Sequence, residues 1–206
     1  MPTSAEVASV GYAPKAHVYD ELLDGDGRMR EHWSRLAQAL GALGAGELSR
    51  RWDAAQRALR ENGVTYNVYD DSRGMDRPWQ LDPVPLLVSA GEWRTLERGL
   101  AQRAYLLNLI LDDIYNQRSL IRQRILPAEL VFRNPGFLRP CHGTIVRGGR
   151  WLHLYAADLA RDPSGSFWVL GDRAQAPSGM GYALENRIVL SRLFPSLYRD
   201  CRVQRL

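Results

Sequence analysis

The sequence predicts an α+β fold, in which a helical N-terminal part precedes a mixed α/β part that contains a β-hairpin. Two observations carry this prediction. Apolar residues recur at helical spacing through residues 29–63 and again through residues 89–116. Two strand-like segments joined by a turn sequence then lie within residues 151–171. The length of 206 residues, with 45% hydrophobic and 24% charged residues, is typical of a globular protein.

The N-terminal half begins with two predicted helices. Residues 29–44 and 46–63 each show helical periodicity, and the glycines between them predict a break in the helix. Residues 64–71, VTYNVYDD, are β-branched and aromatic and therefore predict a strand. The apolar segment 85–89, PLLVS, predicts another strand.

A long amphipathic helix is the most strongly indicated element. Ser89 precedes Glu92 by three residues, as in a capping box, and the helix is expected to end near Asn116. Short helical turns are expected at residues 119–124 and from Pro127, since proline suits a first helical position. The long helix carries one apolar stripe, formed by Trp93, Leu96, Leu100, Ala104, Leu107, Leu111 and Ile114.

The C-terminal part contains the hairpin and a final helix. WLHLYAADLA at 151–160 and SFWVLG at 166–171 are strand-like, and RDPSG between them is a turn sequence. Residues 182–194 are helical in pattern, and Pro195 is expected to stop that helix.

Polar residues near the ends of the hairpin strands suggest a metal site. Antiparallel pairing would bring together Asp158 and Asp172, and Glu185 and Asn186 open the helix that follows. Carboxylate and amide oxygens are hard ligands of the kind that magnesium prefers. The alternative gives each residue a local role: Asp158 caps a turn, Asp172 is solvated and Glu185 pairs within its helix.

The loop between the last strand and the last helix suggests a phosphate site. Ser178 and Gly179 lie in a glycine-bearing turn whose backbone N–H groups precede a helix, a geometry that favours an anion. Arg173 and Arg187 are expected to meet the phosphates. Such a loop is also common as a simple connection.

Charge and composition constrain the class of protein. The net charge of +4 comes from 27 basic residues that are spread along the chain among acidic ones, a weak indicator of nucleic-acid binding. Neither an apolar run of membrane-spanning length nor a signal peptide is visible, so a cytoplasmic protein is expected. Cys141 and Cys201 are interpreted as ordinary thiols, and no catalytic residue is assigned.

Several separate motifs follow one another along the chain. They are YDE at 19–21, HW at 32–33, ENGVTYNVY at 61–69, RPWQLDPVP at 77–85, EWRTLERGLAQRAYLLN at 92–108, FLRPC at 137–141 and DRAQAPSGMGYALENR at 172–187. Together, from about Tyr19 to Leu206, they resemble one known family, the circularly permuted ATP-grasp proteins.

The resemblance implies an ATP-dependent ligase that is similar to glutathionylspermidine synthase. Such an enzyme activates a carboxylate as an acyl phosphate and joins it to an amine, using ATP and Mg²⁺; its substrates are small-molecule or peptide carboxylates and amines. In the family, a carboxylate on one strand and Glu-x-Asn on the next hold the metal. Asp158 matches the first carboxylate, but the Glu-x-Asn window falls on Gly171, Asp172 and Arg173.

That departure leaves Asp172 as the sole oxygen donor of the window, to be completed by Glu185 or Asn186. The chain has a single lysine, Lys15, so the lysine-bearing half of the nucleotide clasp has no counterpart here. The sequence therefore predicts an incomplete enzyme or fragment that needs a C-terminal half or a partner chain. A non-catalytic binding or scaffolding module with a degenerate metal site is the alternative.

Three segments are expected: a flexible N-terminus at 1–18, a helix-rich part at 19–130, and at 131–206 the start of the ATP-grasp-like metal- and phosphate-binding part.

Overall fold

The computed structural model describes residues 12–66 and 77–204, which form two compact units. Of the described residues, 12–66, 77–89 and 178–204 form the first unit, and 90–177 form the second. Most of the predicted flexible N-terminus, residues 1–11, lies outside the described residues. The functional boundary after residue 130 stays a prediction.

The first unit opens with a kinked helical pair. A short 3-10 helix, η1 (Glu31–Trp33), leads into α2 (Ser34–Glu61). Gly44 interrupts α2 with φ 70° and ψ 162°, backbone angles that glycine adopts without a Cβ penalty. The predicted break between two helices is therefore confirmed.

The first unit contains the main hydrophobic core of the chain. Helices α6 (Met180–Leu193) and α7 (Pro195–Asp200) pack against α2, and Pro195 is the first residue of α7, so the predicted end of the preceding helix is confirmed. Phe194 and Leu36 are the most deeply buried large side chains, 2% and 1% exposed. The buried cluster consists of Trp33, Leu36, Ala55, Leu59, Val189, Leu190, Leu193, Phe194 and Leu197.

Two short strands, β1 (Thr65–Tyr66) and β2 (Arg77–Pro78), pair antiparallel in this unit. They confirm the start of the strand predicted at 64–71, whose residues 67–71 lie outside the described part. The strand predicted at 85–89 is wrong, because these residues are irregular. Proline at position 85 has no N–H to donate to a strand ladder.

The second unit is built on the predicted long helix, α3 (Ala90–Tyr115). The chain then folds back through short helical turns, and the turns expected near residues 119 and 127 are confirmed. They are α4 (Ser119–Arg122), α5 (Ala128–Phe132) and the 3-10 turns η2 (Arg139–Cys141) and η3 (Arg147–Gly149).

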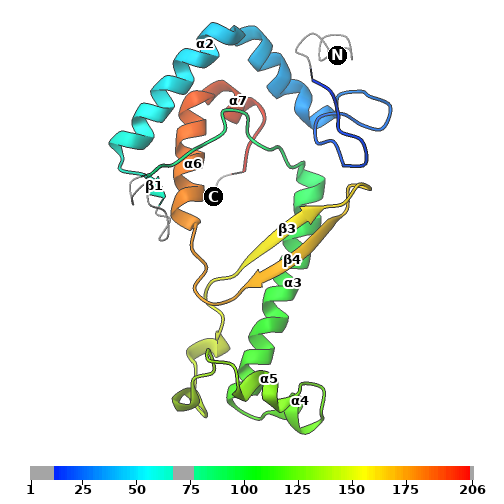
Figure 1. Ribbon diagram of the computed structural model, residues 1–206, viewed down its shortest axis with the longest axis vertical. Helices are drawn as coiled ribbons and strands as arrows, with labels where there is room; N and C mark the ends of the chain where they lie inside the picture. The colour runs from blue at the N-terminus through cyan, green and yellow to red at the C-terminus, as the bar shows by residue number, and fades with distance from the viewer. Residues whose placement is uncertain (1–11, 67–76, 205–206) are drawn as a thin grey trace. The chain divides into compact units, whose positions relative to one another are not determined.

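The predicted hairpin is confirmed as β3 (Ala156–Arg161) and β4 (Phe167–Arg173), which pair antiparallel beside α3 (Figure 1). The first strand begins later than expected because Trp151 and Leu152 donate their backbone N–H groups to the side chain of Asn108 on α3. The pairing is irregular: Leu159 lies opposite Val169, whereas Asp158 lies opposite Gly171. Leu170 is therefore the extra residue of a β-bulge.

Among the helices of the described parts, none is long and apolar enough to cross a membrane. Cys141 and Cys201 are both free, which confirms their interpretation as thiols.

Candidate functional site

The β-bulge decides which way the predicted site residues of the hairpin point. Leu159 and Val169 line a groove against α3. Successive residues of a strand alternate between the two faces, so Asp172, three residues after Val169, would point away from α3 in a regular strand. The extra residue Leu170 resets the alternation, and Asp172 faces α3.

Asp172 is held tightly by two side chains of the second unit. Arg103 on α3 donates from Nε to Oδ1 and from Nη2 to Oδ2, both at 2.6 Å. The Tyr155 hydroxyl donates to Oδ1, also at 2.6 Å. The hydrogen bond from Arg103, and then that from Tyr155, lower the pKa of Asp172 to about 2. Burial, and then the hydrogen bond to Asp172, raise the pKa of Tyr155 to about 12.

Asp158 lies on the opposite face of the hairpin. Its neighbour there is Arg173, whose Nε is 2.9 Å from Oδ2, and the two side chains are 50% and 61% exposed. Gly171, directly across the ladder, leaves this face open, since a Cβ at that position would come no nearer than 3.8 Å to Oδ2 of Asp158. Asp158 therefore presents an accessible carboxylate on the open face of the hairpin.

The turn end of the hairpin, where β3 ends and β4 begins, contacts the start of α3. Arg161 Nη1 donates to Glu92 Oε1 at 2.7 Å, and the guanidinium carbon of Arg161 lies 3.9 Å from the centre of the Phe167 ring. Between this contact and Asp172 runs an open groove of about 1080 Å³. Its apolar walls include Leu96, Leu100, Leu106, Leu159, Phe167 and Val169.

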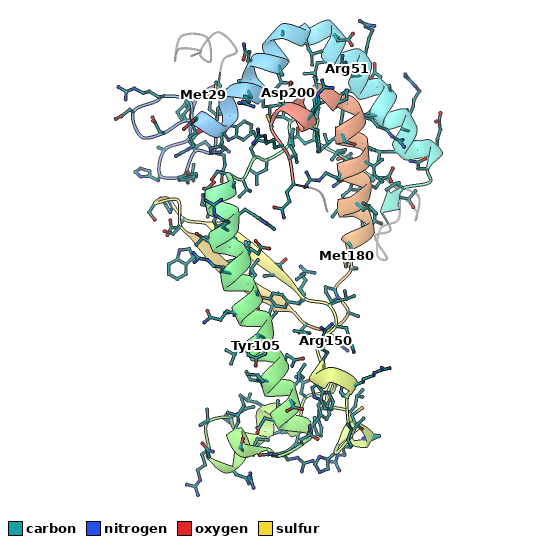
Figure 2. The ribbon with its side chains drawn as sticks, turned by 180° about the vertical axis from the view of Figure 1, so that it is seen from behind. Met29, Arg51, Tyr105, Arg150, Met180 and Asp200 are labelled. Carbon is teal, nitrogen blue, oxygen red and sulfur yellow. The ribbon has the colours of Figure 1, made fainter. Side chains whose placement is uncertain are left out.

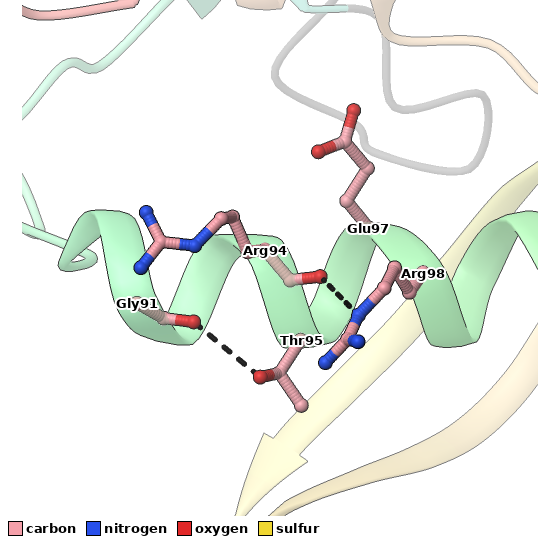
Figure 3. A pocket seen from close by; sticks show the side chains of 5 residues that line it. All are labelled: Gly91, Arg94, Thr95, Glu97 and Arg98. Carbon is pink, nitrogen blue, oxygen red and sulfur yellow. Dashed lines mark hydrogen bonds between the residues drawn. The ribbon is translucent and has the colours of Figure 1, made fainter.

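A second hollow, on the first turns of α3, gathers none of the predicted site residues. Figure 3 shows its lining, Gly91, Arg94, Thr95, Glu97 and Arg98, all from this one helix. Its hydrogen bonds stay within the helix: Thr95 Oγ1 donates to Gly91 O, and Arg98 Nε donates to Arg94 O. The hollow therefore contributes no converging groups from other elements.

Glu185 and Asn186 lie in the first unit, where both fasten α6 to the segment that follows α2. Asn62 Nδ2 donates to Glu185 Oε1 at 2.8 Å, and Trp79 Nε1 donates to Asn186 Oδ1 at 2.7 Å. Tyr182 stacks on Trp79 with ring centres 4.3 Å apart. These contacts give Glu185 and Asn186 structural partners within their own unit.

The predicted phosphate residues begin α6. Gly179 is the N-cap, with φ 108°, a left-handed conformation that favours glycine, and no side chain caps the helix. Ser178 is exposed beside it. Arg187 lies two turns further along α6, and its guanidinium carbon is 5.7 Å from the centre of the Tyr198 ring. The backbone N–H groups in the first turn of α6 therefore have no capping side chain and can donate to a ligand.

The described residues contain no group of three or more histidine, cysteine, aspartate or glutamate side chains placed to hold a metal ion. Asp158 and Asp172 lie on opposite faces of the hairpin. A single metal site with the ligands Asp158, Asp172, Glu185 and Asn186 stays a prediction.

Sequence reasoning missed Arg103 and Tyr155, the partners of Asp172, and Trp79, the partner of Asn186. Arg103 and Asp172 are separated by 69 residues, and Trp79 and Asn186 by 107. No local pattern reports such contacts. The one available signal was the position of Arg103 off the apolar stripe of α3, which left it available to pair.

Comparison of the chain with known proteins identifies a family and several relatives. The model of the circularly permuted ATP-grasp type 2 family matches residues 85–206. The chain is 40% identical over 190 residues to an uncharacterized protein of Mycobacterium tuberculosis strain H37Rv, covering 88% of this chain and 22% of the relative. It is 38% identical over 186 residues to an uncharacterized protein of Synechocystis sp. strain PCC 6803, covering 90% of this chain and 39% of the relative.

A further uncharacterized protein of Mycobacterium tuberculosis H37Rv is 37% identical over 206 residues, covering 98% of this chain and 37% of the relative. The chain therefore spans between 22% and 39% of the length of these curated relatives.

Proposed function

Because the chain belongs to the circularly permuted ATP-grasp type 2 family, we propose that it forms part of an ATP-dependent ligase-like enzyme that joins a carboxylate to an amine. The observation that carries the proposal is the family match over residues 85–206, which contains the hairpin, the glycine loop and α6 together. The closer similarity to glutathionylspermidine synthase, and activation of the carboxylate as an acyl phosphate, are parts of this proposal.

ATP and Mg²⁺ are the cofactors that we propose for the whole protein. Bound magnesium would neutralise phosphate charge during transfer. Asp158 is the hairpin carboxylate best suited to contact it, since Asp158 is half exposed on the open face. Asp172 would serve as a ligand only after it breaks its hydrogen bonds with Arg103 and Tyr155. Glu185 and Asn186 would likewise have to break their hydrogen bonds with Asn62 and Trp79.

The residues of this chain have separate roles in the proposed site. Arg103 and Tyr155 hold Asp172 and thereby fix β4 against α3, which keeps the face with Asp158 in a constant orientation. Ser178 and the free N–H groups after Gly179 would bind phosphate oxygens, and Arg187 would add positive charge.

The substrates that we propose are a small-molecule or peptide carboxylate and an amine. Because the relatives are much longer than this chain, we propose that a C-terminal half or a partner chain supplies the lysine-bearing side of the nucleotide site. A cytoplasmic setting is part of the same proposal.

The experiment is to measure ADP release by the full gene product with Mg²⁺ and ATP, in the presence of pooled carboxylate and amine substrates. D158N is expected to lower the rate by about 10- to 100-fold, the usual cost of disturbing a metal site. D53N, which removes an exposed carboxylate on α2, is the matched control and should keep the wild-type rate. Equal rates in D158N and wild type would contradict the proposed contact of Asp158 with magnesium.

A non-catalytic binding or scaffolding module is the second candidate function. The observation that favours it is that both hairpin carboxylates already have arginine partners, Asp158 with Arg173 and Asp172 with Arg103. Absence of magnesium-dependent ADP release from the full gene product, together with intact folding, would favour this candidate.

A further inference from the structure

The excess positive charge of the chain is concentrated in residues 117–150, which we call the arginine lobe. Seven arginines minus one glutamate, Glu129, give the lobe a formal charge of +6, whereas the whole chain carries +4. The remaining residues together are therefore slightly acidic, and the even spread of charge expected from the sequence is wrong. The arginines are Arg118, Arg122, Arg124, Arg133, Arg139, Arg147 and Arg150.

Most of these arginines have no role inside the described structure. Arg118 is half-buried, with its guanidinium carbon 5.4 Å from the centre of the Phe132 ring. The other six side chains are exposed, and none of them forms an ion pair with a described residue. Arg150, labelled in Figure 2, directly follows η3. Charges that are neither buried nor paired are available to an external partner.

Stacked aromatic rings join the lobe to the end of α3. The ring of Tyr115, a buried residue, stacks between Phe137 and Trp151, with centres 5.2 Å and 5.0 Å apart. The carbonyl oxygen of Tyr115 accepts a hydrogen bond from Gly143 N at 2.9 Å, and His142 Nδ1 lies 2.7 Å from it. His142 therefore also contacts the end of α3.

Side chains of α3 also fix both ends of the lobe. Asp113 accepts backbone hydrogen bonds from Ser119 at 2.8 Å and Leu120 at 3.0 Å, where the lobe begins. Asn108 donates to Gly149 O at 2.9 Å and accepts from Trp151 N at 2.8 Å, where it ends. A surface that is already ordered loses little backbone freedom on binding.

Aliphatic side chains are exposed among the arginines. Ile145 is 95% exposed, and Ile125, Leu130 and Leu138 are also largely in solvent. Arginine combined with exposed apolar groups is typical of protein interfaces, where lysine is depleted; the lobe has no lysine. Proteins that bind single-stranded nucleic acids typically stack bases on exposed aromatic rings. Here Tyr115, Phe137 and Trp151 stack on one another, and the partly exposed Phe132 ring contacts Phe137 and Arg118.

We propose that the arginine lobe is a docking surface for an acidic polypeptide segment in which glutamate or aspartate alternates with aliphatic residues. The carboxylates of the segment pair with the exposed arginines, and its aliphatic side chains cover Ile145 and Leu138. This interaction is independent of ATP and magnesium, so its test and the test of the ligase-like function can fail separately.

The test measures binding of a short fluorescent peptide that repeats Glu-Glu-Leu-Ser to this chain, by fluorescence anisotropy without nucleotide. The variant R139Q/R147Q/R150Q should raise the dissociation constant about tenfold, since three partly exposed ion pairs are lost. Ile145→Ser should weaken binding without a change of charge. A peptide that repeats Gln-Gln-Leu-Ser should bind much more weakly than the glutamate peptide.

The matched control is R57Q/R60Q/R98Q, which removes the same charge from exposed positions on α2 and α3 and should leave the dissociation constant nearly unchanged. Absence of binding to the wild-type chain would overturn the proposal, as would an equal loss in the two triple variants. Tighter binding of single-stranded oligouridine, weakened by the lobe variant, would identify a nucleic-acid surface and also overturn it. Circular dichroism of each variant verifies that the fold is retained.

Discussion

Replacing Asp172 by asparagine removes the contact that fastens the bulged end of β4 to α3. The wild-type carboxylate accepts two hydrogen bonds from Arg103 and one from Tyr155, all at 2.6 Å. The Asp172 and Arg103 side chains are 24% and 45% exposed, so the ion pair is only partly screened by solvent. Such a pair contributes up to about 1 kcal/mol, and the tyrosine hydrogen bond about another 1 kcal/mol.

D172N should therefore weaken docking of the hairpin by about 1–2 kcal/mol. In native-state hydrogen exchange, this loss lowers the protection of the β3 and β4 amides by roughly 5- to 30-fold. D158N is the matched control, because it removes the more exposed carboxylate on the opposite face. Its effect on the same amides should stay below about 0.5 kcal/mol.

A double-mutant cycle between Arg103 and Asp172 measures the contact directly. R103Q should reproduce most of the effect of D172N, and the combination R103Q/D172N should cost little more than either change. Additive effects of the two substitutions, or equal loss of protection in D172N and D158N, would refute the reasoning that the bulge directs Asp172 onto α3.

Three further predictions concern other contacts. Hydrogen bonds from Ser164, and then from Trp168, lower the pKa of Asp162 to about 2. The stability that this carboxylate adds to the hairpin turn is therefore present above about pH 4 and is lost as the pH falls through 2. The indole N–H resonance of Trp168 should shift over that pH range, and D162N should abolish the shift. F194A empties a fully buried position in the first unit and should lower the free energy of unfolding by about 3–5 kcal/mol in urea titrations, whereas a loss below about 1 kcal/mol would contradict the assigned core. W79F keeps the stacking on Tyr182 but loses the hydrogen bond to Asn186, and it should cost about 1 kcal/mol by thermal unfolding; an unchanged melting temperature would contradict that contact.

Local sequence patterns were sufficient to predict the main elements. The apolar stripe along α3, the kink at Gly44 and the turn sequence between β3 and β4 each depend on residues that are close in the chain. The strand predicted at 85–89 failed because an apolar segment becomes a strand only where a partner strand pairs with it. Periodicity alone does not report that partner.

The candidate site was harder to predict, because its geometry depends on one irregularity and on distant contacts. Antiparallel pairing of the hairpin strands predicted that Asp158 and Asp172 lie close together, but the bulge at Leu170 directs their side chains to opposite faces. Arg103, which binds Asp172, lies on a helix 69 residues earlier in the chain. The clustering of arginines in the arginine lobe is visible in the sequence. Only the structure shows that most of these side chains are exposed and that stacked aromatic rings join the lobe to α3.

The most direct test of the ATP-dependent function is equilibrium binding of labelled ATP to the full gene product, with and without Mg²⁺. We predict saturable binding that magnesium strengthens and that unlabelled ATP competes away. Absence of saturable binding by the folded protein, at ATP concentrations up to the millimolar range, would contradict it.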